Sequence, residues 1–293
     1  MPREAEPSIN ERAFILEALQ ENIRLDGRPL DAFRELHIAF GEEYGVADVQ
    51  LGKTRVLCRI SASIASPYPD RKFDGIFTIT TELSPLASPA FEVGRQSDLE
   101  THLSRVLETT LRRSQALSTE SLCLIAGQKV WSLRADIHIL SHFGNLIDTS
   151  CIAALAALRH CRIPDTSIKG GVLIVYTPLE RDPVPLALLH HPLCITLNYF
   201  ESGEKMLVDA TLQEQQCSEG EIVVSANPQG EVCLVQKGGG GEVDALVLLR
   251  GIGLAVGKVR EVGKVIDRVL EEDAKRRDKG GVVSRELRAE NER

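Results

Sequence analysis

The sequence lacks the features of membrane-bound and secreted proteins. No apolar run approaches the roughly 20 residues that a membrane-spanning helix needs. The first ten residues are polar and acidic, with neither the apolar core of a secretory signal nor the basic bias of a transit peptide. We therefore expect a soluble protein of the cytosol or nucleus, with no membrane partner.

Paired cysteines and an excess of positive charge are also missing. The seven cysteines form no C-x-x-C pair, and most lie in apolar runs such as Leu122-Cys123-Leu124, so we expect reduced core residues. The net charge of −8 argues against a free-standing, non-specific nucleic-acid binder. Any contact with RNA or DNA must therefore be local.

What is present is the composition of a globular protein, with 293 residues that are 43% hydrophobic and 26% charged. In the first half, periodicity predicts helices at 8–23, 97–114 and 148–159. It predicts strands at 36–40, 46–51, 54–63, 77–83, 122–125, 130–140 and 172–176. A proline-rich connection follows, which we expect to have no regular structure. After it the order partly recurs, with strands at 193–199, 205–208, 221–227 and 232–236 and a long helix to 277.

These elements predict an α+β protein made of two β-then-α lobes with a pseudo-repeat. The expected divisions are an N-terminal helix and arm (1–28), a first lobe (29–176), a second lobe (177–277) and a charged tail (278–293).

A glycine turn between a strand and a helix is the candidate anion site. The segment His142-Phe143-Gly144-Asn145-Leu146 lies between the strand at 130–140 and the helix at 148–159, where backbone N–H groups gather as they do in phosphate-binding loops. Yet no Lys or Arg occurs between Arg134 and Arg159, and phosphate-processing enzymes normally add an arginine fork. The loop has the shape of an anion site without its charge.

Two further patterns could carry chemistry. Asp209 ends a predicted strand and Glu214 follows it closely, and two such carboxylates could hold a metal or do acid–base work. Glutamine at 215 and 216 weakens that interpretation. Gly52-Lys53-Thr54 is superficially like a phosphate-binding loop, but a strand follows it, which favours a hairpin turn.

The predicted helix from Ser97 carries basic residues on its outer side. At 100° per residue, Arg105 and Arg112 fall about 20° apart, opposite the apolar face. Arg95 precedes this helix, and Arg113 follows Arg112 directly. A basic edge on an acidic protein is either a solvated face or a track for a phosphodiester backbone.

Several motifs occur in a joint spacing that is far more specific than any one of them: Arg24-Leu25-Asp26-Gly27-Arg28, Leu51-Gly52-Lys53-Thr54, Pro89-Ala90-Phe91-Glu92 with Gly94-Arg95, Glu120-Ser121-Leu122-Cys123, Trp131 to Asp136, and Glu180-Arg181-Asp182-Pro183-Val184-Pro185. With this spacing, roughly residues 8 to 277 resemble the RNase PH family, and within it the ring subunits of the eukaryotic RNA exosome. The resemblance implies the RNase PH fold (ribosomal protein S5 domain 2-like).

The same resemblance implies a place in a hexameric ring with a central channel for RNA. The implied partners are other RNase PH-like ring subunits, an S1/KH cap subunit, RNA and exosome-associated nucleases. The implied role is to scaffold the ring and guide RNA for 3′–5′ degradation and processing, including rRNA processing and mRNA decay. The implied location is the cytoplasm and the nucleus, including the nucleolus.

The resemblance also implies lost chemistry. Active relatives cleave RNA from its 3′ end with inorganic phosphate as nucleophile, and hold it with a Gly-Thr-Arg or Gly-Ser-Arg loop where this chain has Gly144, Asn145 and Leu146. Their catalytic pair is two aspartates six residues apart; the first matches Asp209 and the second falls on Gln215. Because a leucine does not hold phosphate and an amide is no general acid, we expect a non-catalytic subunit without cofactor or metal. The alternative is a phosphorolytic 3′–5′ exoribonuclease, or a contributor of half of a shared site.

For RNA contact, the resemblance points to the basic helix. Arg105 matches a basic position that contacts RNA in related ring subunits, and Arg112 is expected to continue its face, with Arg113 beside it. The next usually basic family position is Thr109, so the track is thinner here. Arg95, in Gly94-Arg95, matches the pair that meets RNA in active members.

Overall fold

The computed structural model describes residues 6–277, except residues 93, 95, 170–171, 179 and 201–202. Two sequence predictions therefore lie outside the described residues, namely the RNA contact of Arg95 and the charged tail at 278–293.

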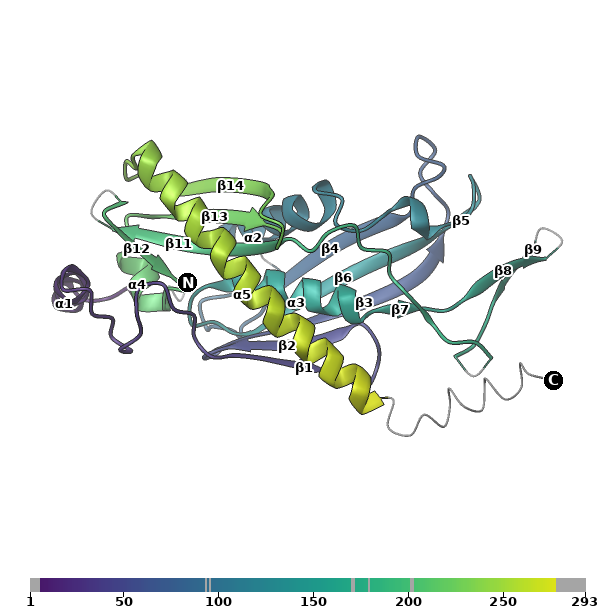
Figure 1. Ribbon diagram of the computed structural model, residues 1–293, viewed down its shortest axis with the longest axis horizontal. Helices are drawn as coiled ribbons and strands as arrows, with labels where there is room; N and C mark the ends of the chain where they lie inside the picture. Colours follow the sequence, from purple (N-terminus) through teal and green to yellow (C-terminus); the bar gives the residue numbers. More distant parts are fainter. Residues whose placement is uncertain are drawn as a thin grey trace.

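The first sheet fills one end of the molecule (Figure 1). Its strands run in the order β1-β2-β3-β6-β4, with β5 paired to the end of β6. All pairs are antiparallel except β4 with β6. The strand bounds are β1 Leu36–Phe40, β2 Val46–Leu51, β3 Thr54–Ala65, β4 Ile76–Leu83, β5 Cys123–Ile125 and β6 Lys129–Ser141.

The second sheet is antiparallel and runs in the order β12-β11-β13-β14. Every residue of its strand β11 is buried, because α3 packs against this strand as well as α5. This burial explains the unbroken apolar character of the strand. The bounds are β11 Leu193–Phe200, β12 Lys205–Val208, β13 Gly220–Ala226 and β14 Val232–Gly239.

Helix α3 (Leu146–His160) joins the two sheets. It is buried along nearly its whole length and contacts β2 and β3 of the first sheet as well as β11 of the second. The sheets therefore share one hydrophobic core rather than forming two separate ones. The long helix α5 (Ala245–Arg277) crosses over both sheets (Figure 1).

The N-terminal helix α1 (Ile9–Gln20) begins at a capping box formed by Ser8 and Glu11. It packs Ile15 and Leu19 against Phe200, Leu207 and Cys217, which belong to a smaller second core cluster. This contact fixes the arm near the short helix α4 (Leu212–Cys217).

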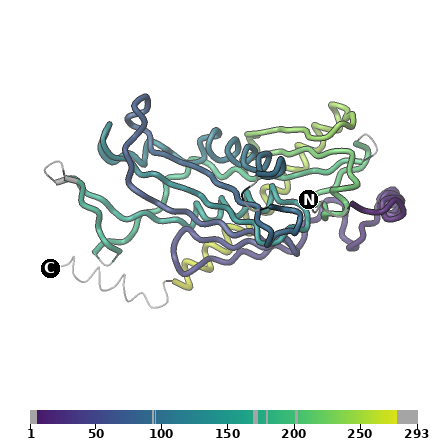
Figure 2. Tube along the Cα trace, turned by 180° about the vertical axis from the view of Figure 1, so that it is seen from behind, coloured from purple at the N-terminus to yellow at the C-terminus, as the bar shows by residue number. Residues whose placement is uncertain are grey.

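A narrow projection extends from the end of the molecule opposite α1, on the side of the first sheet (Figure 1, Figure 2). It is built from two pairs of short strands, β7 (Arg162–Ile163) with β10 (Val184–Pro185) and β8 (Thr166–Lys169) with β9 (Val172–Val175). The expectation that the proline-rich connection has no regular structure is wrong at β10, because that strand needs only a two-residue edge pairing, where proline is tolerated.

Two general expectations concern the cysteines and the membrane. All seven cysteines are free thiols, five of them buried, as predicted. Among the described residues, no helix is both long enough and apolar enough to cross a bilayer.

Candidate functional site

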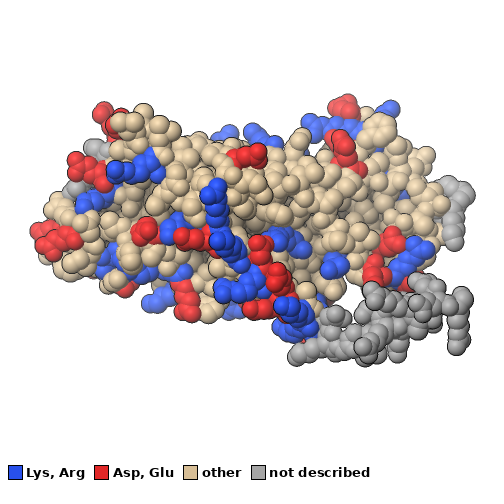
Figure 3. Space-filling model, viewed as in Figure 1, with Lys and Arg blue, Asp and Glu red and all other residues tan. Residues whose placement is uncertain are grey.

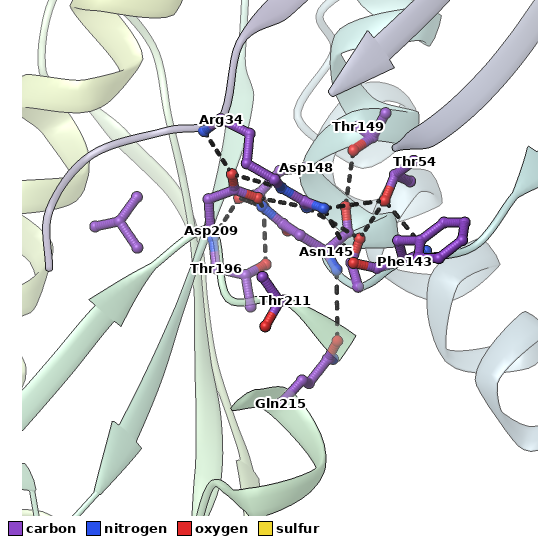
Figure 4. A network of polar contacts seen from close by, with 12 residues as sticks. Arg34, Thr54, Phe143, Asn145, Asp148, Thr149, Thr196, Asp209, Thr211 and Gln215 are labelled. Carbon is purple, nitrogen blue, oxygen red and sulfur yellow. Dashed lines mark hydrogen bonds and ion pairs between the residues drawn. The ribbon is translucent and has the colours of Figure 1, made fainter. Parts of the chain in front are cut away.

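The glycine turn at 142–146 lies where α3 begins, and it packs against the segment that follows β12 (Figure 4). Gly144 has a φ of +88°, and a Cβ atom there would lie 2.6 Å from the backbone nitrogen of Leu212. Only glycine fits this close approach. Asn145 follows in the left-handed region with a φ of 54°, so the turn is held in one conformation by its neighbours.

Asp209 is fully buried at the end of β12 and is the centre of the polar network. Its carboxylate accepts hydrogen bonds from the backbone N–H of Arg34 at 2.7 Å, from the Arg34 guanidinium at 2.7 and 2.9 Å, and from Arg28 at 3.1 Å. Burial opposes ionisation, but the hydrogen bonds and charge of Arg34 outweigh it and hold the pKa of Asp209 below its usual value. Asp209 is therefore an ionised, internally paired anion.

Arg34 is the cation that the local sequence of the loop does not contain. Besides Asp209, its guanidinium donates to the carbonyl oxygens of Phe143 at 3.0 Å and Gly144 at 3.3 Å. The Thr54 hydroxyl donates to the same Gly144 oxygen at 2.8 Å. The loop therefore lacks a cation only in its own stretch of sequence. In space an arginine is present, but carboxylate and carbonyl oxygens already occupy its donors.

Asn145 joins two buried carboxylates. Its amide nitrogen donates to Asp209 at 2.8 Å and to Asp148 at 3.0 Å. Asp148 also accepts from the backbone and the hydroxyl of Thr196, at 3.0 and 2.8 Å. Burial raises the pKa of Asp148 to about 7, against the hydrogen bonds from Thr196 and Asn145. A phosphate in this cradle would face carboxylates, which disfavours its binding.

Leu146 and Gln215 occupy the two positions that the resemblance identifies as altered. Leu146 is 4% exposed and belongs to the main core. Gln215, in α4, accepts the Asn145 N–H at 3.4 Å and donates to Glu221 at 3.4 Å. An amide supports both contacts because it carries a donor and an acceptor, whereas an ionised carboxylate only accepts. Both side chains therefore contribute to packing in this structure.

Glu214 does not pair with Asp209 as a candidate metal or acid–base site. Its two oxygens accept from the buried Arg24 guanidinium at 2.7 and 3.0 Å, and it forms a capping box with Thr211. Arg24 also donates to the carbonyl oxygen of Asp209 at 2.9 Å. Over the described ranges, no cluster of three or more metal-binding side chains is found.

The basic helix is interrupted. Arg105 is exposed on α2 (Asp98–Leu107), while Arg112 and Arg113 are exposed on η1 (Glu108–Arg113). The latter is π-helical, since the N–H of Ser114 bonds the carbonyl of Thr109 five residues earlier. The prediction that Arg105 and Arg112 fall about 20° apart is wrong here, because it assumed α-helical geometry throughout.

The long helix α5 offers no competing basic track. On the face shown in Figure 3, Lys and Arg side chains lie beside Asp and Glu side chains along this helix. Adjacent carboxylates weaken the attraction of a cation for phosphate, so α5 is a poorer candidate for RNA contact than α2 and η1, although Arg112 of η1 also pairs with Glu108 at 3.0 Å.

Fold and site together define an α+β protein in which a strand–glycine turn–helix cradle lies against an aspartate from a second sheet. Two family models match this chain, the 3′ exoribonuclease family, domain 1, over residues 32–164 and the same family's domain 2 over residues 190–258. The chain belongs to this 3′ exoribonuclease (RNase PH) family. The resemblance and the RNase PH fold inferred from the motifs are confirmed.

The relatives are more specific. The chain is 47% identical over 278 residues to exosome complex component rrp45 of Schizosaccharomyces pombe, an alignment covering 95% of this chain and 96% of that protein. It is 45% identical to exosome complex component RRP45 of Homo sapiens, covering 92% of this chain but 62% of the human protein. Among solved structures, a chain of the Archaeoglobus fulgidus exosome with RNA bound to the active site has a TM-score of 0.77 at 29% identity, covering 87% of this chain and 97% of that one.

Sequence reasoning missed Arg34, Thr54 and Asp148 as parts of the site. Arg34 contacts Asp209 across a separation of 175 residues, and no local pattern reveals such a pair. Thr54 fits the local pattern of a hairpin turn, which gives no sign of a contact with Gly144. Asp148, a buried acid in the first turn of an apolar helix, was a usable signal, because an acid there needs hydrogen-bond donors.

Proposed function

We propose that the chain is a ring subunit of an RNA exosome that has no phosphorolytic activity of its own and contributes arginines to the path of the RNA. The names of its relatives and its likeness to an archaeal exosome chain support the assignment to the complex. One observation carries the non-catalytic part. The cradle is filled by internal contacts, with Arg34 bound to Asp209, Leu146 in the core and Gln215 where a second aspartate would stand.

The proposed partners are other RNase PH-like ring subunits, an S1/KH cap subunit, RNA and the nucleases that associate with an exosome. In this role the chain scaffolds the hexameric ring, with lobes at 29–176 and 177–277, while associated nucleases degrade or process RNA from its 3′ end. The proposed location is the cytoplasm and the nucleus, including the nucleolus.

The proposed RNA contacts are Arg105 on α2 and Arg112 and Arg113 on η1, with Arg95 as a further candidate. The three described arginines are exposed, so they contact phosphates without desolvating a buried charge. Such contacts are electrostatic, and the affinity they provide falls as salt concentration rises.

The test is RNA protection in the reconstituted complex. We expect Arg105→Glu to shorten or abolish protection of a long single strand in a salt-dependent way, while the complex still assembles. Arg268→Glu, the same change at an exposed position of α5, is the matched control and leaves protection intact. Equal protection with both variants would remove Arg105 from the RNA path.

Membership of the complex is tested by the mass of the assembly that co-purifies with the tagged full chain. A ring-sized assembly containing other RNase PH-like subunits is expected. A chain that purifies alone, or only with itself, would refute the proposed function regardless of any RNA contact.

A further inference from the structure

The C-terminal part of α5 continues beyond the match to the family. The domain 2 model ends at residue 258, whereas α5 runs to Arg277. Residues 259–277, which we call the strap, bury Val262 and Ile266 in the main core. Helix α5 contacts β11 and β13 of the second sheet, and it also reaches α3 and β1 of the first sheet (Figure 1). The strap therefore ties the helix of the second sheet to the first sheet.

His160, the last residue of α3, lies buried beneath the end of the strap. Its Nδ1 accepts the Gly45 N–H at 3.2 Å, and its Nε2 lies 3.3 Å from the Asp273 carboxylate. The imidazole also contacts the rings of Phe40 and Tyr44, with centroids 4.4 and 5.3 Å away. One side chain thus joins the end of α3, the turn between β1 and β2, and α5.

Arg277, the last residue of α5, closes the same junction. Its guanidinium donates to the Asp273 carboxylate at 2.6 Å. It also donates to two backbone carbonyls of the β1–β2 turn (residues 41–45), those of Gly41 and of Glu42, the latter at 2.8 Å. The turn is therefore bound both by the imidazole at the end of α3 and by the guanidinium at the end of α5. We call these two side chains, Asp273 and the turn the latch.

The closed latch accommodates a neutral imidazole. Because Nδ1 accepts the Gly45 N–H, the ring proton is on Nε2, and a second proton on Nδ1 would face that N–H, donor against donor. The charged groups around the ring are Asp273 and Arg277 of α5 and Arg162 of β7, and the β1–β2 turn adds a tyrosine ring. Burial, followed by the charge of Arg277, lowers the pKa of His160 to about 4. Protonation therefore breaks a hydrogen bond that holds the latch closed.

We propose that the latch is a pH-sensitive device, in which protonation of His160 separates the end of α5 from the β1–β2 turn while both sheets stay folded. The inference goes beyond the proposed function and does not depend on it. Opening is confined to this end of α5 because most of residues 267–276 are exposed, whereas Val262 and Ile266 stay in the core. Segments with few buried contacts open at a lower free energy than core elements do.

The size of the response follows from the two states of the latch. In the open latch the His160 ring is solvated and its pKa returns to about 6.5, against about 4 in the closed latch. The open form therefore binds the proton more tightly, and its population rises as pH falls through this window, by at most about tenfold per pH unit. Between pH 7.5 and pH 5 the ratio of open to closed latch should rise about 30-fold.

Hydrogen exchange of the full chain, followed by mass spectrometry, measures this opening. Protection factors are calculated against the intrinsic exchange rate at each pH, because amide exchange itself depends on pH. From pH 7.5 to pH 5, protection of the β1–β2 turn and of residues 271–277 is expected to fall about 30-fold, whereas β6 keeps its protection. Unchanged protection of the two segments would overturn the proposal, and so would an equal loss in β6, which would indicate global unfolding.

The variant His160→Gln isolates the titrating group. A glutamine oxygen can accept the Gly45 N–H while its amide nitrogen faces Asp273, and the amide gains no proton in this pH range. We expect both segments of this variant to be equally protected at pH 5 and pH 7.5. The matched control is His138→Gln, at a partly exposed histidine 3.0 Å from Glu82, which should respond to pH as the wild type does. If His160→Gln also responds as the wild type does, another group controls opening and the proposal is wrong.

The variant Arg277→Gln tests the outer contact of the latch. It removes the donors to Gly41 and Glu42, so protection of both segments is expected to fall even at pH 7.5. The matched control is Arg276→Gln, because Arg276 donates to Asp273 at 2.5 Å and its loss leaves the contacts of Arg277 with the turn in place. Protection in Arg277→Gln that equals that of the wild type would overturn the arrangement proposed for the latch.

Discussion

At the scale of single residues, Asp209 shows how a position that the family resemblance assigns to catalysis can stabilise the fold. Its carboxylate is fully buried and is bound by Arg34, Arg28 and Asn145. It even adopts a left-handed backbone conformation, with a φ of 52°, which is uncommon outside glycine, asparagine and aspartate. These contacts tie the N-terminal arm, the cradle and the second sheet together.

Replacing Asp209 by asparagine is expected to lower the free energy of unfolding by about 3–5 kcal/mol, because it leaves two arginines without their buried partner. Denaturant unfolding of the full chain measures this loss. Asp48→Asn is the matched control, since Asp48 pairs with Arg55 at a partly exposed site and should cost about 1 kcal/mol or less. A small effect at Asp209 would mean that its ion pairs contribute little.

Restoring the missing arginine by Leu146→Arg should not restore phosphorolysis. Leu146 is 4% exposed, so the new guanidinium would be forced into the core or would disrupt the start of α3, at a cost of several kcal/mol. Nucleoside diphosphate release and denaturant unfolding on the same preparation measure both effects. A stable, active Leu146→Arg variant would contradict the view that the cradle is now a packing element.

The family pattern aligns Leu146 and Gln215 with site positions, and the loss of chemistry inferred from them stays a prediction. The contacts that these two side chains make in the fold could not be predicted from the sequence. Arg34 and Asp209 lie 175 residues apart, and no local sequence pattern reveals that the fold brings them together.

At the scale of elements, most strands and the long helices follow from apolar periodicity, and β1, β2 and β12 match their predicted bounds. The π-helix at η1 was missed because side-chain patterns do not report i→i+5 hydrogen bonding. Helix α4 was also missed, although Thr211 and Glu214 form a capping box that a search for this motif would have found.

Where α3 ends, His160 connects it to the end of α5. The imidazole Nδ1 accepts the Gly45 N–H at 3.2 Å, and its Nε2 lies 3.3 Å from the Asp273 carboxylate. Burial, followed by the charge of Arg277, outweighs Asp273 and lowers the pKa of His160 to about 4. The folded chain therefore keeps this ring neutral under conditions that protonate it in the unfolded chain.

This difference gives stability a defined pH dependence. Between the unfolded pKa of about 6.5 and the folded value of about 4, the unfolded state binds more protons, so the contribution of His160 to stability falls as pH falls through this window. Comparing unfolding midpoints at pH 7 and pH 5, we expect a smaller drop in His160→Gln than in the wild type. Equal drops would place the folded pKa near its ordinary value.

At the scale of the whole molecule, two sheets share one core around α3, and the chain carries a net charge of −8. The sequence predicted the fold class, while the local nature of any RNA contact stays a prediction. It did not predict where the loop between β3 and β4 lies, because that loop is held by hydrogen bonds of Gly75 with Thr119 and of Lys72 with Gly127.

The central claim is that this chain keeps the RNase PH fold without its chemistry, and one measurement tests it most directly. A reconstituted complex is supplied with single-stranded RNA and inorganic phosphate, and nucleoside diphosphate release is compared between the wild-type chain and Gln215→Ala. We predict no release that depends on this chain, so the two complexes behave alike. Phosphate-dependent release that disappears in Gln215→Ala would show a working site at the cradle and contradict the account.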